Sequence, residues 1–173
     1  MPELDDVPQA LQRRAHHEGM RTVRAFTGPT HLTSEQTVWA IQQINKLEPV
    51  DEVHTGAAIG LDTLAATTCV HKMPNAKHVI FVPAAPYDQR IFRKMYIALN
   101  QSHGFTVVKC PSIGLNPANY RKRNEMMLDG ATELCAFATS DKFYRSGEWM
   151  TINIARKADI PVHLFVLTNG EES

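Results

Sequence analysis

A short segment of the sequence combines glycines, other small residues and a carboxylate in a spacing that suits phosphate or ribose binding. Residues 55–62 read Thr-Gly-Ala-Ala-Ile-Gly-Leu-Asp and lead from an apolar run into a helix-like stretch. Small residues let a phosphate approach backbone N–H groups, and a helix N-terminus adds about half a positive charge. Asp62 could instead accept a hydrogen bond from a ribose hydroxyl, and an ordinary tight turn stays open. The predicted binding residues in this segment are Thr55, Gly56, Ala58, Gly60 and Asp62.

Two further segments could complete an anion site. Thr27 and Gly28 follow the first apolar run, where glycine allows close backbone approach and threonine offers a hydroxyl. Arg123 and Asn124 belong to a basic stretch in which an arginine could pair with phosphate. A plain turn and a solvated basic helix face are the structural alternatives. We predict that all four residues contact the ligand.

The segment around residue 148 could bind an anion or carry out chemistry. Ser146 and Gly147 begin a helix-like stretch and Thr151 adds a hydroxyl one turn later, so these three residues join the predicted ligand site. Glu148 is the candidate catalytic residue, because a carboxylate beside a bound ribose could stabilise an oxocarbenium-like centre or act as nucleophile in N-glycosidic cleavage. Its structural alternative is a glutamate that interacts only with the helix dipole.

The sequence lacks the common motifs for dinucleotide binding, for nucleoside triphosphate binding and for metal binding by histidines. Residues 55–62 form neither a GxGxxG dinucleotide fingerprint nor a Walker A loop. The eight histidines show no HExxH or HxxxH spacing, so neither a metal ion nor a required cofactor is predicted. The expected ligand is a nucleotide or a nucleotide-sugar phosphate.

Short apolar or β-branched runs alternate with helix-length stretches along the chain. The runs cover 22–26, 52–55, 78–82, 105–109, 134–138 and 162–167, and the helix-like stretches cover 61–72, 88–102, 117–129 and 147–158. A further helix is expected to begin after Thr33 or Ser34 as its cap and to bury one stripe of residues spaced three apart, namely Val38, Ile41, Ile44 and Leu47.

This alternation predicts an α/β fold, a Rossmann-like doubly wound and mostly parallel sheet with helices on both faces. In such sheets ligands bind beyond the carboxyl ends of the strands. Residues 27–28 and 55–62 are expected at that edge.

Composition and charge limit the class of protein. The chain of 173 residues is 43% hydrophobic, which suffices for one core, and its 18 basic residues equal its 18 acidic ones. The protein therefore lacks the net charge that drives non-specific binding to nucleic acids or membranes. We expect a weakly structured N-terminal arm over residues 1–20, a single Rossmann-like domain over 21–168 and a polar tail over 169–173.

The lack of a recognisable targeting signal and the pattern of cysteines indicate a cytoplasmic protein. The N-terminal residues are too acidic and too poor in apolar side chains for a signal peptide, and no apolar run approaches the roughly 18 residues that a membrane helix needs. Cys69, Cys110 and Cys135 are odd in number and far apart, which argues against a disulfide framework or a structural zinc site. We expect a cytoplasmic protein that does not associate with membranes.

Taken in order, the segments resemble the SLOG superfamily, a Rossmann-like group that includes the DNA-processing protein A (Smf) family, YspA-like proteins and the LOG phosphoribohydrolases. The resemblance covers roughly residues 21–167. The DNA-processing pattern Ser-Gly-x-Ala-Arg-Gly-Ile-Asp is matched by Thr55, Gly56, Ala58, Gly60, Leu61 and Asp62. The aromatic-x-x-Arg-Asn element of that family falls on Tyr120, Arg123 and Asn124, and its Ser-Gly helix start falls on Ser146 and Gly147.

The sequence departs from these family patterns at positions that bear on function. Ile59 stands where the DNA-processing pattern has arginine, and Glu125 stands where a basic residue follows Arg-Asn. The LOG signature, Pro-Gly-Gly-x-Gly-Thr followed by glutamate, is not present. The resemblance therefore implies a protein that binds a nucleotide or nucleotide derivative as a sensor or carrier. An N-glycosidic nucleotide hydrolase or transferase and a single-stranded DNA-binding relative of the DNA-processing proteins stay open as alternatives, and so does a homodimer.

Overall fold

The computed structural model of the protein describes residues 20–82, 104–109, 117–139 and 147–168. In these ranges six strands form one sheet in the order β4-β3-β2-β1-β5-β6, and each adjacent pair is parallel. The strands are β1 (Val23–Thr27), β2 (Glu52–Gly56), β3 (Lys77–Val82), β4 (Thr106–Lys109), β5 (Glu133–Ala138) and β6 (Val162–Val166). The helices of the same ranges are α2 (Ser34–Lys46), α3 (Leu61–Lys72), α5 (Pro117–Leu128) and α6 (Gly147–Lys157).

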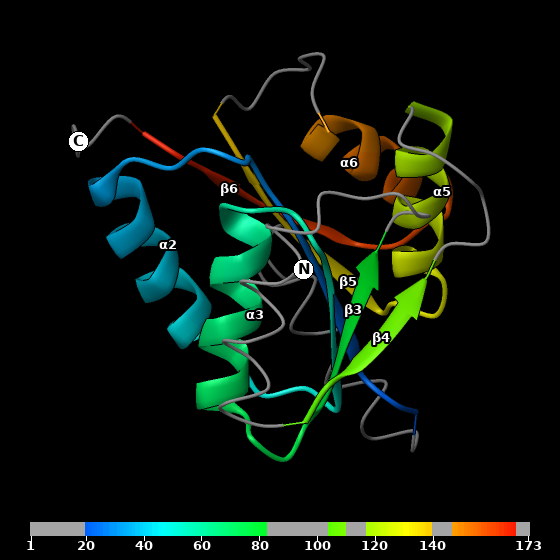
Figure 1. Ribbon diagram of the computed structural model, residues 1–173, viewed down its shortest axis with the longest axis horizontal. Coiled ribbons are helices and arrows are strands. Elements are labelled where there is room, and N and C mark those ends of the chain that lie inside the picture. Colours follow the sequence, from blue (N-terminus) through cyan, green and yellow to red (C-terminus); the bar gives the residue numbers. More distant parts are fainter. Residues whose placement is uncertain (1–19, 83–103, 110–116, 140–146, 169–173) are drawn as a thin grey trace, which may run out of the picture.

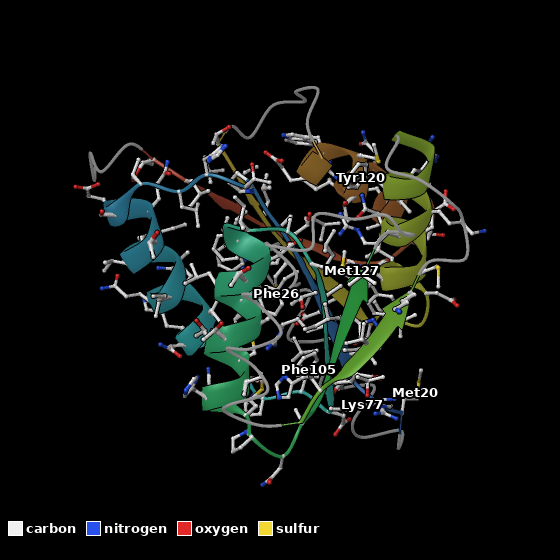
Figure 2. The ribbon with its side chains drawn as sticks, viewed as in Figure 1. Met20, Phe26, Lys77, Phe105, Tyr120 and Met127 are labelled. Atoms are coloured by element: carbon white, nitrogen blue, oxygen red, sulfur yellow. The ribbon has the colours of Figure 1, made fainter. Side chains whose placement is uncertain are left out.

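Helices cover both faces of the sheet (Figure 1). α2 and α3 pack on one face around a core that includes Phe26, whereas α5 and α6 pack on the other face around a core that includes Met127 (Figure 2). The parallel sheet between two helical layers confirms the predicted Rossmann-like α/β class. Strands buried on both faces need apolar side chains on both sides, which is why they read as continuous apolar runs.

The strand order reverses at β1. The chain steps outward from β1 through β2 and β3 to β4, then returns to place β5 on the other side of β1. In doubly wound sheets the crevice at such a reversal, outside the carboxyl ends of the strands, is where ligands bind. The loops after β1 and β2 lie at this edge, together with the first turns of α3, α5 and α6.

The described strands and helices coincide closely with the expected runs. The expected helix over residues 88–102 lies outside the described residues. So do residues 1–19 of the predicted N-terminal arm and the predicted tail, 169–173.

The buried face of α2 differs from the predicted stripe. Thr33 is the cap, as expected, and forms a capping box with Gln36. Val38, however, is 56% exposed, so its predicted place in the buried stripe is wrong. Residues spaced three apart drift by about 60° per step around a helix of 3.6 residues per turn, so a stripe of that spacing leaves the contact face. The face that packs on the sheet carries Gln36, Ala40 and Ile44.

A buried ion pair joins the two strands at the point of reversal. Arg24 on β1 and Glu133 on β5 are register partners, and the Arg24 Nε donates to the Glu133 carboxylate. Both side chains are 2% exposed. The Arg24 Nη1 also donates to the Glu48 carbonyl at 2.8 Å. Because a buried charge is tolerated only when it is paired, this contact fixes the pairing of β1 with β5.

We expect Glu133→Leu to lower the free energy of unfolding by about 3–5 kcal/mol, because it removes the counter-charge of buried Arg24. The double variant Arg24→Met/Glu133→Leu replaces the pair by apolar side chains and should recover most of that loss. Urea unfolding of the wild type and the two variants measures both values. A double variant that is no more stable than the single one would contradict this account.

Candidate functional site

The loop after β1 and the start of α3 interlock at the carboxyl edge of the sheet. The Leu61 N–H donates a hydrogen bond of 3.0 Å to the Pro29 carbonyl. Gly60 has a φ of +83°, and a Cβ there would lie 2.5 Å from the carbonyl oxygens of Pro29 and Thr30. A Cβ on Gly28 would lie 2.4 Å from Leu61 Cγ. Both predicted glycines are therefore needed for packing, since neither position has room for a side chain.

Asp62 and Arg123 converge over Gly56, the last residue of β2. Asp62 lies in the first turn of α3 and Arg123 lies on α5, so the two residues come from helices on opposite faces of the sheet. A Cβ added to Gly56 would lie 2.5 Å from Asp62 Oδ2 and 2.7 Å from Arg123 Nη1. The missing side chain of Gly56 thus lets a carboxylate and a guanidinium approach one point above the backbone.

Burial governs the protonation of Asp62. Its side chain is 7% exposed, and its Oδ2 accepts a hydrogen bond of 3.3 Å from the Ala58 N–H. Loss of hydration raises the pKa of Asp62 from 3.8 to about 6, although the Arg123 charge and the Ala58 N–H both oppose the rise. Asp62 therefore becomes charged as the solution passes from mildly acidic to neutral.

Arg123 is held in place by its neighbours on α5 and α6. Its Nε donates a hydrogen bond of 2.8 Å to Asn124 Oδ1. Asn124 is 5% exposed, and its Nδ2 donates to Met150 Sδ at 3.7 Å. With Nε engaged, the terminal nitrogens of the guanidinium are the donors left to face a ligand, and Nη1 is the one that lies over Gly56.

Tyr120 joins the site although it was not among the predicted ligand residues. The guanidinium carbon of Arg123 lies 5.8 Å from the centroid of the Tyr120 ring, which is 39% exposed. Figure 2 shows Tyr120 at the end of the molecule away from Met20 and Lys77. Residues three apart on a helix share a face, and this spacing is the sequence signal that could have identified Tyr120.

The predicted backbone cradle for phosphate is partly occupied by the protein itself. The Ala58 N–H donates to Asp62, and the Leu61 N–H donates to Pro29. Two N–H groups of the loop over residues 55–62 are therefore used within the protein, and the loop presents the Asp62 carboxylate beside the Arg123 guanidinium of α5. Thr27 and Thr55, at the ends of β1 and β2, are buried with 7% and 1% exposed surface.

Of the predicted residues on α6, Glu148 and Thr151 are buried, whereas Gly147, at the start of the helix, is exposed. The Thr151 Oγ1 donates a hydrogen bond of 3.1 Å to the Gly147 carbonyl, so the hydroxyl hydrogen is used within the helix. Glu148 lies in the first turn of α6 and is 9% exposed. Its catalytic role stays a prediction. Ser146 lies outside the described residues.

The basic stretch around Arg123 is partly neutralised. Arg121, one turn away from Glu125, forms an exposed ion pair with it at 3.1 Å. Exposed pairs of this kind contribute little to stability, but each member offsets the charge of the other. Arg123 is thus the arginine of this helix that faces the loop after β2, whereas Arg121 points to solvent with a partner of its own.

A cavity of about 510 Å³ lies elsewhere, between the last turns of α5 and α6. Its lining includes Met126, Leu128, Ile154 and Ile160, and none of the predicted site residues. These helices begin at the carboxyl edge of the sheet, so their last turns lie at the opposite edge (Figure 1). This cavity is therefore not tied to the candidate site by any residue of its lining.

Within the described ranges, no group of three His, Cys, Asp or Glu side chains is close enough together to hold a metal ion. None of the helices in those ranges is long and apolar enough to cross a membrane. Cys69 and Cys135 are free and fully buried, and burial raises the pKa of the Cys69 thiol to about 12. Cys110 lies outside the described residues.

Neither a protein-family model nor a curated protein sequence matches this chain. Solved structures do share its fold. DNA processing protein A from Streptococcus pneumoniae superposes with a TM-score of 0.63 at 17% identity, over 82% of this chain and 49% of that one. DNA processing protein A from Helicobacter pylori, whose structure is described as showing a single-stranded DNA binding mode, superposes with a TM-score of 0.63 at 14% identity, over 88% and 69%.

This chain spans about half the length of the S. pneumoniae protein. The likeness confirms the fold that was expected from the resemblance to the DNA-processing proteins. At such identities it shows the fold alone.

We expect Gly60→Ala to lower the free energy of unfolding by about 3 kcal/mol, because it adds a clash with two carbonyl oxygens to an unfavourable φ. Gly130 has a φ of +78° and nothing within 4 Å of its added Cβ, so Gly130→Ala should cost about 1 kcal/mol. Gly104→Ala, in open space without a positive φ, should be neutral. Urea denaturation of the three variants separates the cost of the positive φ from the cost of the clash with the carbonyl oxygens. Equal losses of unfolding free energy in Gly60→Ala and Gly130→Ala would refute the clash.

We expect the stability of the protein relative to Asp62→Asn to fall as the pH rises. The folded protein holds the Asp62 proton up to a pKa of about 6, whereas the unfolded chain releases it near 3.8. The full advantage of burying the neutral acid exists below pH 3.8 and is lost as the pH rises through about 6. The loss amounts to about 3 kcal/mol. Urea unfolding of both proteins at pH 4, 5, 6 and 7 measures it, and parallel profiles would argue against a neutral buried Asp62.

Proposed function

We propose that the protein binds a nucleotide or nucleotide derivative, as a sensor or carrier, at the carboxyl edge of its sheet. The observation that carries this proposal is the convergence of Asp62 and Arg123 over Gly56. The two side chains come from opposite faces of the sheet, and the loop between them is held by Gly28 and Gly60. A site assembled from separate elements in this way is rigid, which favours specific recognition of a small ligand.

The chemistry of the pair suits a sugar phosphate. The terminal nitrogens of Arg123 are donors in a fixed fork that matches the oxygens of a phosphate. Asp62 is acceptor-only once it is ionised, so it suits a hydroxyl group. Nucleotides carry both groups a few ångströms apart. The location of the pair near the strand reversal supports the same ligand class, because doubly wound sheets bind nucleotides there.

Single-stranded DNA is the second candidate ligand, favoured by the shared fold. One protein with this fold, from H. pylori, is described by its single-stranded DNA binding mode. Two features of this chain oppose the transfer. Ile59 is an exposed apolar residue on the loop after β2, and Glu125 neutralises Arg121 on α5. Binding of a nucleic-acid backbone depends on several basic groups along its path. We therefore rank the mononucleotide above single-stranded DNA as the ligand. We propose together with this function that the chain is a member of the SLOG superfamily.

The test is a thermal-shift titration of the wild type, Arg123→Ala and Arg121→Ala. The ligands are nucleoside mono-, di- and triphosphates, NAD, ADP-ribose, cyclic nucleotides and a short single-stranded DNA. A nucleotide at one hundred times its dissociation constant should stabilise the wild type by about 2.7 kcal/mol. Arg123→Ala should weaken this binding at least tenfold, because a charge-assisted phosphate contact is lost. Arg121→Ala removes an equal charge from the same helix and should bind as the wild type does.

Two outcomes would count against the mononucleotide. The first is a shift of the unfolding temperature with the DNA and with none of the nucleotides. If that shift also weakens steeply with salt, single-stranded DNA replaces the mononucleotide as the proposed ligand. If Arg121→Ala weakens nucleotide binding as much as Arg123→Ala, the binding depends on general charge and the site lies elsewhere.

A further inference from the structure

Asp62 and Arg123 approach each other without forming a bond. Among the described contacts, no ion pair or hydrogen bond joins the two side chains, although both lie within contact distance of the same point over Gly56. Their mutual attraction is nevertheless felt, since the Arg123 charge lowers the pKa of Asp62 against the larger effect of burial. Opposite charges that are held close without a direct bond can both contact a group placed at that point.

The hydrogen-bonding capacity of the pair is only partly used within the described residues. The Asp62 Oδ2 accepts one hydrogen bond, from the Ala58 N–H, and no described contact reaches Oδ1. Arg123 uses Nε for Asn124, and its four terminal N–H groups make no hydrogen bond in the described part of the chain. A ligand that supplies donors to Asp62 and acceptors to Arg123 would use this remaining capacity, and hydrogen bonds to charged groups are among the stronger ones.

The kind of group that can sit at Asp62 follows from charge. A phosphate near neutral pH has no proton to donate and would be repelled by the carboxylate, so it belongs on the Arg123 side. A hydroxyl donates to a carboxylate, and two neighbouring hydroxyls can donate to both of its oxygens. The 2′ and 3′ hydroxyls of ribose form such a pair, whereas 2′-deoxyribose offers only one of them.

We propose that Asp62 binds the hydroxyl pair of a ribose, so that the site selects ribonucleotides over 2′-deoxyribonucleotides. This inference rests on the proposed nucleotide-binding function and adds the residue that sets its sugar specificity. The 2′ hydroxyl is also the group by which proteins distinguish RNA from DNA. The same carboxylate that recognises ribose therefore disfavours a DNA strand in this site.

The direct test compares an equimolar mixture of the four ribonucleoside 5′-monophosphates with the four 2′-deoxy counterparts, by calorimetry or thermal shift at pH 7.5. The wild type should bind the ribonucleotide mixture at least tenfold more tightly, since a hydrogen bond to a charged group is at stake. In Asp62→Asn the amide oxygen can still accept from the Ala58 N–H, so the loop is retained, but the preference for ribose should fall to less than threefold. Asp129→Asn, which changes an exposed carboxylate at the far end of α5, should keep the full preference.

The dependence of affinity on pH gives a second readout of the same contact. Arg123 on α5 is the charged side chain that faces Asp62 in the described part of the chain. If the ribose needs ionised Asp62, a pKa of about 6 predicts that affinity falls about tenfold between pH 7 and pH 5. Uncharged ribonucleosides serve as probes here, because the phosphate of a monophosphate also titrates in this range. Asp62→Asn should show a flat profile.

The outcomes separate this inference from the function on which it rests. Equal affinity of the wild type for the two mixtures would overturn the ribose assignment and leave nucleotide binding standing. A ribose preference that persists in Asp62→Asn would overturn the role of Asp62 specifically. If neither mixture binds, the ribose inference fails, and the thermal-shift titration with di- and triphosphates, NAD, ADP-ribose and cyclic nucleotides decides separately whether the proposed function stands.

Discussion

The contact between the loop after β1 and the first turn of α3 is the constraint on which the site depends. Gly28 touches Leu61 so closely that no side chain fits between them, and Gly60 turns the backbone beneath two carbonyl oxygens of that loop. The Leu61 N–H then bonds to one of these carbonyls. With α3 held at this point, the side chain of its second residue, Asp62, lies back over the end of β2. The position of a functional carboxylate thus follows from the packing of two glycines.

The opposing face contributes the positive charge, and the sheet sets the distance between the two. Arg123 reaches the end of β2 from α5, where Asn124 and Met150 hold it between two helices. The two charges come from separate helical layers, and no ion pair joins them among the described contacts. Charges held apart in a partly dehydrated site are costly to the fold, and they act strongly on whatever enters between them. Binding sites commonly lower the stability of the fold while they favour recognition of the ligand.

Much of the fold could be predicted from the sequence, because its dominant feature is local. Parallel strands that are covered on both faces carry mostly apolar side chains, so runs such as 134–138 can be recognised directly in the sequence. The wrong place of Val38 shows the limit of that approach, since spacing alone does not say which side of a helix meets the sheet. Arg24 and Glu133 could not be paired from sequence either. Arg24 lies in the middle of the run 22–26 and Glu133 just before the run 134–138, and the two residues are 109 positions apart.

The loops that form the candidate site could be predicted from the sequence, but the hydrogen-bonding groups that they present could not. The glycine pattern and the Arg-Asn element indicated the right loops, which the fold brings to one edge. The expectation of free N–H groups around a phosphate took no account of internal competition. Asp62 occupies the Ala58 N–H, and Pro29 occupies the Leu61 N–H. The first contact lies within one loop, four residues apart, whereas the second joins segments about thirty residues apart and depends on how the fold brings them together.

The buried Arg24 also bears on how the chain reaches its fold. The strand β1 can pair with β2 early, because a single helix separates them, whereas its other neighbour, β5, is added after most of the chain has been made. Until then one edge of β1 is open, and an apolar open edge invites strands of other molecules. Arg24 places a positive charge on that strand, which discourages such pairing, and Glu133 neutralises the charge only when the correct strand arrives. Before β5 arrives, the unpaired charge of Arg24 thus disfavours the pairing of β1 with strands of other molecules.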